Sequence, residues 1–327
     1  FRPWFGILLL LAICLPWYIK VGLDTNWEWT KGFFFQHNLG RFTGEMEGHG
    51  GIFLITPGYI ILGLFPFSAF IIQAVTKGWK ERENDFLFFN WIAALSIVLF
   101  FTVSKTKLPN YTVPAYPFFA TLLGSYLVSL FTKSKSEKET GFKSSNWFLL
   151  IFSILVPVGA YIAFSLDESL LSVRNVAFLL LILPIGILWA FFKFQKSEYR
   201  QAAKITAATT ILTSLVVFCI AMPIVDRQNP VIKCVEQVKN SSPIVFWEKY
   251  NPAFSFYLKR PIRELKDSVD FRNFVANNPN GVIITTTKKI KDIDPKLVLK
   301  TDTVSKGKDL FETPVTLVLR PKRINLQ

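Results

Sequence analysis

Apolar residues along this chain gather into long blocks that polar stretches separate. A membrane-spanning helix needs about 20 mostly apolar residues, and seven blocks are close to that length. They cover residues 3–19, 53–75, 86–103, 111–131, 147–165, 175–192 and 203–223. The pattern therefore predicts a polytopic α-helical membrane protein with seven spans. Several blocks contain proline, which membrane helices tolerate where neighbouring groups bind the freed carbonyls.

The pattern changes after the last block, where apolar runs shorten to strand length. These runs are Ile244–Trp247, Val282–Thr286 and Val315–Leu319. Helix-like segments such as Asp267–Ala276 lie between them, which is typical of a small α/β domain. We therefore expect a transmembrane module over residues 1–223 and an α/β domain over residues 224–327. Trp247 and Tyr257 are expected in the core of that domain.

Charge predicts the orientation of the spans in the membrane. One set of connections carries twelve Lys and Arg residues and consists of residues 76–85, 132–146 and 193–202, with Arg2 and Lys204. The alternate set carries five and consists of residues 20–52, 104–110 and 166–173. Because cytoplasmic loops carry the excess of positive charge, the first set is predicted to face the cytoplasm. Seven spans then place the C-terminal domain outside, at the periplasmic face of a bacterial cytoplasmic membrane.

Composition excludes several classes of protein. Charged residues make up only 18% of the chain, against about 25% in a typical soluble domain. The net charge of +14 comes from 37 basic and 23 acidic residues, and the basic residues of the C-terminal domain form no run typical of nucleic-acid binding. No Gly-rich phosphate loop and no GxSxG motif occurs. The three cysteines suggest no disulfide framework.

The first outer loop, residues 20–52, carries most of the candidate chemistry. Its aromatic stretch around Trp29 suits a helix at the membrane interface. Both histidines of the protein, His37 and His49, fall in this loop. Arg41 follows the aromatic stretch, and its guanidinium can bind a phosphate through two parallel hydrogen bonds. An arginine that extends to lipid headgroups is the alternative reading of the same position.

The second outer loop, residues 104–110, is short and polar. Lys105 and Lys107 lie at an outer edge where positive charge is disfavoured, so a lipid phosphate or a carboxylate should offset them. Alternatively, the Lys105 and Lys107 side chains extend to lipid headgroups and take no part in a site.

A metal site is also open in the first outer loop. It would use His37, His49, Glu45 and Glu47, although their spacing matches no zinc pattern. His49 has glycine on both sides and would equally suit a hydrogen bond to a sugar or a phosphate. We therefore expect no firm cofactor and leave a divalent metal open.

Five motifs in order resemble a known family. They are Leu15–Tyr18, His37–Phe42, Gly48–Gly51, Leu64–Ser68 and Ser104–Tyr111 with its Lys-Leu-Pro-Asn-Tyr. Together they resemble the bacterial protein-mannosyltransferase and aminoarabinose-transferase family, membrane glycosyltransferases of the GT-C fold (families 39 and 83). The likeness covers residues 1–131, and Asn251–Leu258 is similar to a stretch of the family's C-terminal domain.

The resemblance implies that a sugar moves from a polyprenyl phosphate to a lipid A-like or protein acceptor outside the cytoplasmic membrane. It implies a role at the donor phosphate for Arg41, Lys107 and Tyr111. The residues expected to contact substrate are His37, Asn38, His49, Lys105 and Asn110. The family's proposed catalytic acid lies in an earlier outer loop, so we expect this chain to be the C-terminal part of such an enzyme. No catalytic residue is named, and nothing marks Glu45 or Glu47 as the base.

Two other classes of function were weighed. A transporter or flippase would carry charged residues in the middle of its spans, and these are nearly absent here. A membrane-anchored binding protein would act through the C-terminal domain, and its two outer loops would then tolerate mutation. The gathering of polar residues at the outer edge favours the transferase.

Overall fold

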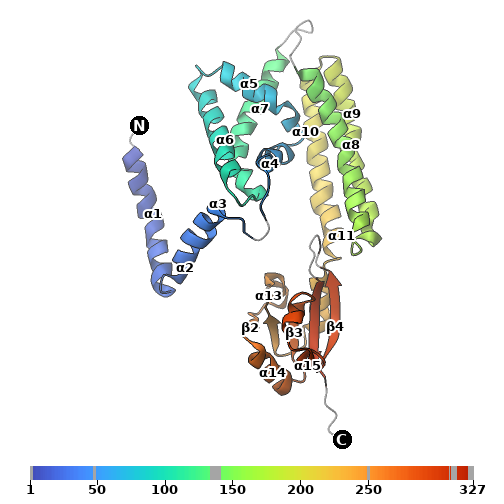
Figure 1. Cartoon of the computed structure of the whole chain (residues 1–327). Helices are drawn as coiled ribbons and strands as arrows, with labels where there is room; N and C mark the ends of the chain where they lie inside the picture. Colours follow the sequence, from blue (N-terminus) through green and yellow to red (C-terminus); the bar gives the residue numbers. More distant parts are fainter. Residues whose placement is uncertain are drawn as a thin grey trace. The chain divides into compact units, whose positions relative to one another are not determined.

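The computed structural model describes residues 3–46, 49–132, 141–248, 251–308, 310 and 315–322 (Figure 1). It divides into two compact units. The first comprises the described residues up to Ile151 together with Ile187–Ala207, and the second comprises Phe152–Gly186 and the described residues from Ala208 onward. Helices α8 (Phe142–Leu166), α9 (Ile182–Gln195) and α10 (Tyr199–Val216) contribute residues to both units. The domain boundary expected at residue 223 stays a prediction.

Six helices within the described residues are long and apolar enough to cross a membrane. They are Pro3–Asp24 (α1), Asp85–Val103 (α6), Pro109–Phe131 (η3 and α7), Phe142–Leu166 (α8), Leu171–Gln195 (η4 and α9) and Tyr199–Asp226 (α10, η5 and α11). Each lies where the apolar blocks predict a span, so the expectation of a polytopic helical protein is confirmed.

The block at residues 53–75 differs from the single span expected there. It forms α4 (Ile55–Gly63), the short helix η2 (Phe67–Phe70) and α5 (Ile71–Lys80), with a bend of 117° at the break. Pro66 lies in the break, where it has no N–H to continue the helical hydrogen bonds. The Ser68 hydroxyl donates to the Ile61 carbonyl at 2.6 Å, which satisfies one of the groups that the break exposes.

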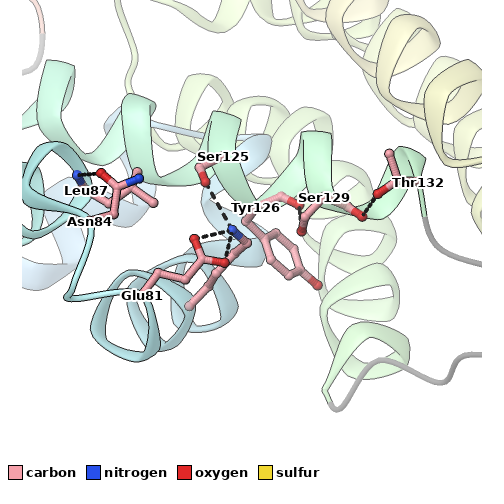
Figure 2. A network of polar contacts seen from close by, with 8 residues as sticks. Glu81, Asn84, Leu87, Ser125, Tyr126, Ser129 and Thr132 are labelled. Carbon is pink, nitrogen blue, oxygen red and sulfur yellow. Dashed lines mark hydrogen bonds and ion pairs between the residues drawn. The ribbon is translucent and has the colours of Figure 1, made fainter.

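Polar contacts hold the far end of α5 against α7 (Tyr116–Phe131; Figure 2). The Lys77 ammonium donates to both carboxylate oxygens of Glu81 at 2.7 and 2.6 Å, and to the Ser125 hydroxyl of α7 at 3.2 Å. Gly78 permits the close approach, since a Cβ there would lie 2.9 Å from a methyl of Leu122. The Asn84 side chain accepts two backbone N–H groups and begins α6.

The first outer loop contains the helix that its aromatic residues predict. Helices α2 (Glu28–Lys31), η1 (Gly32–Gly40) and α3 (Arg41–Thr43) follow one another without a break. Aromatic rings join this outer helix to α1. Trp17 contacts Trp29 at 5.1 Å between ring centroids, and Tyr18 contacts Phe34 at 5.4 Å. Aromatic pairs of this kind add to the free energy of apolar burial and fix the angle between two helices.

The C-terminal domain contains a five-stranded sheet of order β2-β1-β3-β5-β4. Its strands are β1 (Ile244–Trp247), β2 (Arg263–Leu265), β3 (Val282–Thr286), β4 (Thr301–Lys308) and β5 (Val315–Pro321). β1 pairs in parallel with β2 and β3, whereas β5 pairs antiparallel with β3 and β4. The three predicted strands are confirmed. β2 and β4 were missed because one is very short and the other is mostly polar.

Helices cover both faces of this sheet. α12 (Pro230–Val238) and α13 (Pro252–Leu258) pack on one face, where Phe246 and Phe254 are fully buried. α14 (Ser268–Asn277), the turn η6 (Lys289–Asp292) and α15 (Pro295–Val298) pack on the other, around Trp247. The core position expected for Trp247 is confirmed. The core position expected for Tyr257 is wrong. Its side chain is 40% exposed on α13, whereas Phe254, one turn earlier on the same helix, is fully buried.

Candidate functional site

A pocket of about 580 Å³ lies in the first unit between the outer helix and the end of α6. Its wall consists of Phe34, His37, Asn38, Leu39, Arg41, Phe42, Phe100, Phe101, Ser104 and Tyr111. Half of these side chains are apolar. The polar ones are Arg41 and four residues that can donate hydrogen bonds, His37, Asn38, Ser104 and Tyr111. No carboxylate lines the pocket among the residues that the structure describes. The pocket thus combines apolar walls with one permanent positive charge.

Helical spacing brings the residues of the outer helix to the pocket. Phe34, His37, Asn38 and Arg41 follow one another at intervals of three, one and three residues, which places them on one face of a helix. The segment η1 is a π-helix, whose wider turns are frequent at functional sites. Within it the Asn38 amide donates to the carbonyl of Phe33, five residues earlier, at 2.7 Å.

The opposite wall comes from the end of α6 and from η3 (Pro109–Ala115). Two stacked ring pairs fix this wall. Phe101 stacks on Tyr111 at 4.9 Å between centroids, and Phe42 stacks on Phe100 at 5.2 Å. Stacking on Phe101 therefore holds the Tyr111 ring in place and fixes the position of its hydroxyl.

Hydrogen bonds join the two outer loops, which the sequence analysis treated separately. The backbone N–H groups of Lys105, Thr106 and Lys107 donate to the carbonyls of Phe42, Arg41 and His49 at 3.0, 3.0 and 2.7 Å. The buried Thr106 hydroxyl donates to the Gly44 carbonyl at 2.9 Å and accepts the Met46 N–H at 3.1 Å. The backbone of Arg41 is thus fixed by the second loop, which makes the pocket one structure built from both loops.

Lys107 supports the pocket wall from behind. It is only 6% exposed, and its ammonium donates to the carbonyls of Thr102 and Ser104 at 2.7 Å each. Carbonyls at the end of a helix lack intrahelical partners and carry partial negative charge, so a cation there is stabilising. Lys107 does not line the pocket. Its position suits a residue that shapes the wall, through Ser104, better than one that contacts a ligand.

The structure brings together only part of the expected site. Arg41, Tyr111, His37 and Asn38 line the pocket. The other expected residues do not line it: His49, Lys105 and Asn110 are exposed, and Lys107 is buried behind the wall. Ser104 and the aromatic wall were not among the residues expected to contact substrate. The spacing from Phe34 to Arg41 would have indicated one helical face, but nothing in the sequence shows that α6 ends opposite it.

The metal site considered for the first outer loop finds no support. Among the residues described, no group of three or more His, Cys, Asp or Glu side chains lies close enough to hold an ion. Glu47, one of the four residues considered, lies outside the described residues. The donors that line the pocket suit an anion instead, because a guanidinium and a phenol can both donate to phosphate oxygens.

No known protein-family pattern matches the chain as a whole. Individual relatives do, and they are named undecaprenyl phosphate-alpha-4-amino-4-deoxy-L-arabinose arabinosyl transferase. The protein of Photorhabdus laumondii is 30% identical over 46% of this chain and 27% of its own length. Those of Aeromonas hydrophila and Pseudomonas aeruginosa are 26% and 25% identical over 69% of this chain, and 42% and 40% of their own lengths.

Two solved structures of ArnT from Cupriavidus metallidurans are similar to this chain over 96% of its length. One is bound to undecaprenyl phosphate, with a TM-score of 0.67 and 16% identity, and the other is the apo state, with a TM-score of 0.66. The fold is that of a polytopic GT-C membrane protein. The resemblance that the sequence motifs indicate is thereby confirmed. The chain spans 60% of that structure and between a quarter and about two fifths of the curated relatives.

Proposed function

We propose that this GT-C chain serves the transfer of a sugar from a polyprenyl-phosphate donor to a lipid A-like or protein acceptor. The pocket of Arg41 and Tyr111 carries the proposal. An amphiphilic donor needs a cationic end for its phosphate and apolar walls for the first part of its chain, and this pocket has both. The names of the relatives support a polyprenyl phosphate as the carrier and 4-amino-4-deoxy-L-arabinose as the first sugar to test.

Arg41 and Tyr111 would act on the leaving group. In the transfer, the bond between the sugar C1 and the phosphate oxygen breaks while a bond from the acceptor oxygen to C1 forms. The departing phosphate gains negative charge, which a guanidinium and a phenol O–H aimed at its oxygens stabilise. The acceptor hydroxyl loses its proton to a base, for which we assign no residue. His37 and Asn38 line the same pocket and would contact the donor next to the phosphate.

The proposed site lies at the extracytoplasmic face of the bacterial cytoplasmic membrane. The loops that the sequence assigns to the cytoplasm carry twelve Lys and Arg against five in the outer loops, which supports this orientation. Counting the bent pair of α4 and α5 as one span gives seven spans before the C-terminal domain. A lipid-linked donor is reached from the membrane edge, where the two outer loops lie in this orientation. We therefore also propose that the C-terminal domain is periplasmic.

Binding of undecaprenyl phosphate to the chain in lipid nanodiscs tests the proposal directly. We expect Arg41→Ala to weaken binding about 100-fold, since charge-assisted hydrogen bonds contribute about 1.5–3 kcal/mol each. Arg82→Ala is the matched control: it removes the same charge from a guanidinium that lies over the Trp79 ring, at the other end of α6. Equal affinities of the Arg41→Ala and Arg82→Ala variants would contradict the phosphate role.

Transfer is tested with the undecaprenyl-phosphate-linked aminoarabinose donor and lipid A as the acceptor. We expect labelled sugar to appear on the acceptor when the chain acts together with the segment that carries the family's expected catalytic acid. This holds for the unaltered sequence and for the Arg82→Ala variant, and not for Arg41→Ala. Donor binding without transfer to lipid A would indicate that the acceptor is another molecule. If neither donor binding nor transfer occurs, the proposal is refuted.

A further inference from the structure

A second pocket lies in the C-terminal sheet domain and has no part in the proposed transfer. It encloses about 400 Å³ at the β2 edge of the sheet. Its lining comprises Ser242, Pro243, Ile244, Val245, Arg260, Pro261, Arg263, Leu265, Phe274 and Asn278. These residues come from the start of β1, from β2 with the segment before it, and from the end of α14. The volume is within the range of about 300–1,000 Å³ that small-molecule sites occupy.

Two arginines line this pocket, and none of the described residues that line it is acidic. The Arg260 guanidinium donates to the Ser241 carbonyl at 2.8 Å, which uses one of its five N–H donors. Arg263 donates to Asp270 at 3.1 Å, and that carboxylate lies outside the lining. Glu264 precedes Leu265 on β2, but alternation along a strand directs its side chain to the opposite face. Both guanidinium groups are thus positioned, and only one has a carboxylate beside it.

A third arginine adds to the positive charge behind this pocket. Arg320, on β5, donates to the Ser241 hydroxyl at 3.1 Å, so Ser241 binds a guanidinium on its carbonyl and another on its side chain. The Nε of Arg320 is buried and has no hydrogen-bond partner among the described residues. Three guanidinium groups therefore surround this corner of the sheet; Asp270 lies beside Arg263, and Asp302 on β4 is the cross-strand partner of Arg320. A bound anion would offset the excess.

The floor of the pocket indicates what carries the anion. Val245, Leu265 and Phe274 are buried and apolar, whereas Ser242 and Asn278 contribute polar groups to the same lining. A saccharide ring matches this mixture, because it has apolar faces and hydroxyl groups at its edge. An inorganic anion alone would leave the apolar floor without a contact. The guanidinium groups favour phosphate, which they bind with two parallel hydrogen bonds.

We propose that this pocket binds a phosphate group carried on a saccharide. The ligand is either a sugar phosphate in solution or the headgroup of a phosphorylated glycolipid, which present the same chemistry. Arg260 and Arg263 bind the phosphate, and the ring packs on Leu265 and Phe274. The site is separate from the Arg41 pocket, and its occupancy does not require the proposed transfer.

Equilibrium binding to the full chain in phosphatidylcholine nanodiscs tests this site with three probes. They are glucosamine 1-phosphate, glucosamine without phosphate, and monophosphoryl lipid A placed in the nanodisc. We expect saturable binding of the phosphorylated sugar and at least tenfold weaker binding of glucosamine. Binding of the free sugar phosphate identifies a soluble ligand, and binding of the lipid-held headgroup alone identifies a glycolipid. Lipid A is also the proposed acceptor, so either result supports the pocket when the Arg263→Gln variant below loses that binding. Binding of neither probe, or binding that Arg263→Gln leaves unchanged, overturns it.

Matched arginine variants locate the binding. Arg263→Gln and Arg260→Gln should each weaken it at least tenfold, whereas Arg272→Gln, on the exposed side of α14, removes the same charge and should leave it unchanged. If Arg260→Gln unfolds the domain, Arg263→Gln still decides, because its side chain is largely exposed. Arg41→Ala should have no effect, which separates this site from the proposed donor pocket. Equal losses in Arg272→Gln and Arg263→Gln would overturn the proposal.

Discussion

Two lysines lie near the two ends of helix α6, Lys77 in the last turn of α5 and Lys107 in the second outer loop, and their charges are stabilised in different ways. At the start of α6, Lys77 pairs with the Glu81 carboxylate, and their side chains are 21% and 45% exposed. At the other end, Lys107 is 6% exposed and donates to two backbone carbonyls, with no carboxylate partner among the described residues. One end is thus a neutral pair near solvent, and the other holds a buried positive charge.

The difference fits the proposal that the Lys107 end of α6 is the one that binds an anion. A charge that is buried without a counter-ion raises the free energy of the folded state unless carbonyl dipoles or a ligand stabilise it. The end with Lys77 gains nothing from an anion, because Glu81 already offsets its charge. The end with Lys107 lies behind the wall that Ser104 and Arg41 share, so a bound phosphate would lower the electrostatic energy there. The comparison therefore separates a contact that only stabilises the fold from one that also prepares a site.

The largest expected effect is that of Lys107→Met compared with Lys77→Met. Loss of the Lys107 ammonium leaves the Thr102 and Ser104 carbonyls without partners and removes a positive charge beside the pocket. We expect stability to fall by about 1.5–3 kcal/mol for each of these bonds. We also expect undecaprenyl phosphate to bind 10- to 100-fold more weakly, because the wall at Ser104 loses its support and the pocket loses a nearby positive charge. Lys77→Met should leave the affinity unchanged and cost at most about 1 kcal/mol of stability. Similar affinities for the two variants would refute the distinction between the two ends.

Thr106→Val tests whether the hydrogen bonds between the outer loops position Arg41. The substitution keeps the shape of the side chain but removes the hydroxyl that binds the Gly44 carbonyl and the Met46 N–H. Two partly buried backbone groups then lack partners, so we expect a loss of about 2 kcal/mol in stability. We also expect affinity for undecaprenyl phosphate to fall about tenfold. Thr121→Val is the control, because that hydroxyl binds only within α7; a fall in affinity there would point to a general effect.

Tyr111→Phe should have a smaller effect than Lys107→Met on the same affinity. The ring remains stacked on Phe101, so only the phenol hydroxyl is lost. The phenol is a neutral donor to a charged phosphate, so we expect the low end of the range for such bonds, about 1.5 kcal/mol, or a roughly tenfold weaker Kd. Tyr116→Phe removes a hydroxyl that hydrogen-bonds inside the protein, to the Tyr59 carbonyl, and should lower stability without changing the affinity. If Tyr116→Phe weakens the affinity and Tyr111→Phe leaves it unchanged, the phosphate binds elsewhere.

Long elements of the fold were predictable because their signals are local. Spans such as Asp85–Val103 and strands such as Val282–Thr286 follow from runs of apolar residues, with boundaries within a few residues of the prediction. The bend at Pro66 was not predicted. A proline alone does not decide between a kink and a break, and the contact that favours the break comes from Ser68, which donates back to Ile61.

The site was predictable only where one helix carries it. His37, Asn38 and Arg41 lie on one helical face, so a reading of the first loop finds them together. The role of Lys107 depends on where α6 ends and on which carbonyls remain free there, and its motif gives no sign of either. His49 was expected to contact substrate through its side chain. The structure uses its backbone carbonyl, which accepts the Lys107 N–H.

A third lysine provides the smallest test of the comparison, through its response to pH. In the second unit, Asp167 accepts hydrogen bonds from the Ser169 hydroxyl and backbone N–H and from the Lys308 ammonium, the last at 3.3 Å. These contacts, that of the Ser169 hydroxyl foremost, hold the pKa of Asp167 below its usual value. Asp167 lies between α8 and η4, outside the spans. The pair resembles Lys77–Glu81 in that a carboxylate offsets the lysine charge.

A carboxylate whose pKa is lower in the folded state stabilises the fold above its unfolded pKa of about 3.9, and this stabilisation is lost as the pH falls through the folded pKa. Lys308 is 39% exposed, so we expect at most about 1 kcal/mol. The unfolding temperature of the unaltered chain should therefore fall further than that of Asp167→Asn between pH 6 and pH 3. High salt should reduce the difference. If Asp167→Asn shows the same dependence on pH as the unaltered chain, the charge of Asp167 does not contribute to stability. The presence of a carboxylate partner would then not be enough to set Lys77 and Lys308 apart from Lys107.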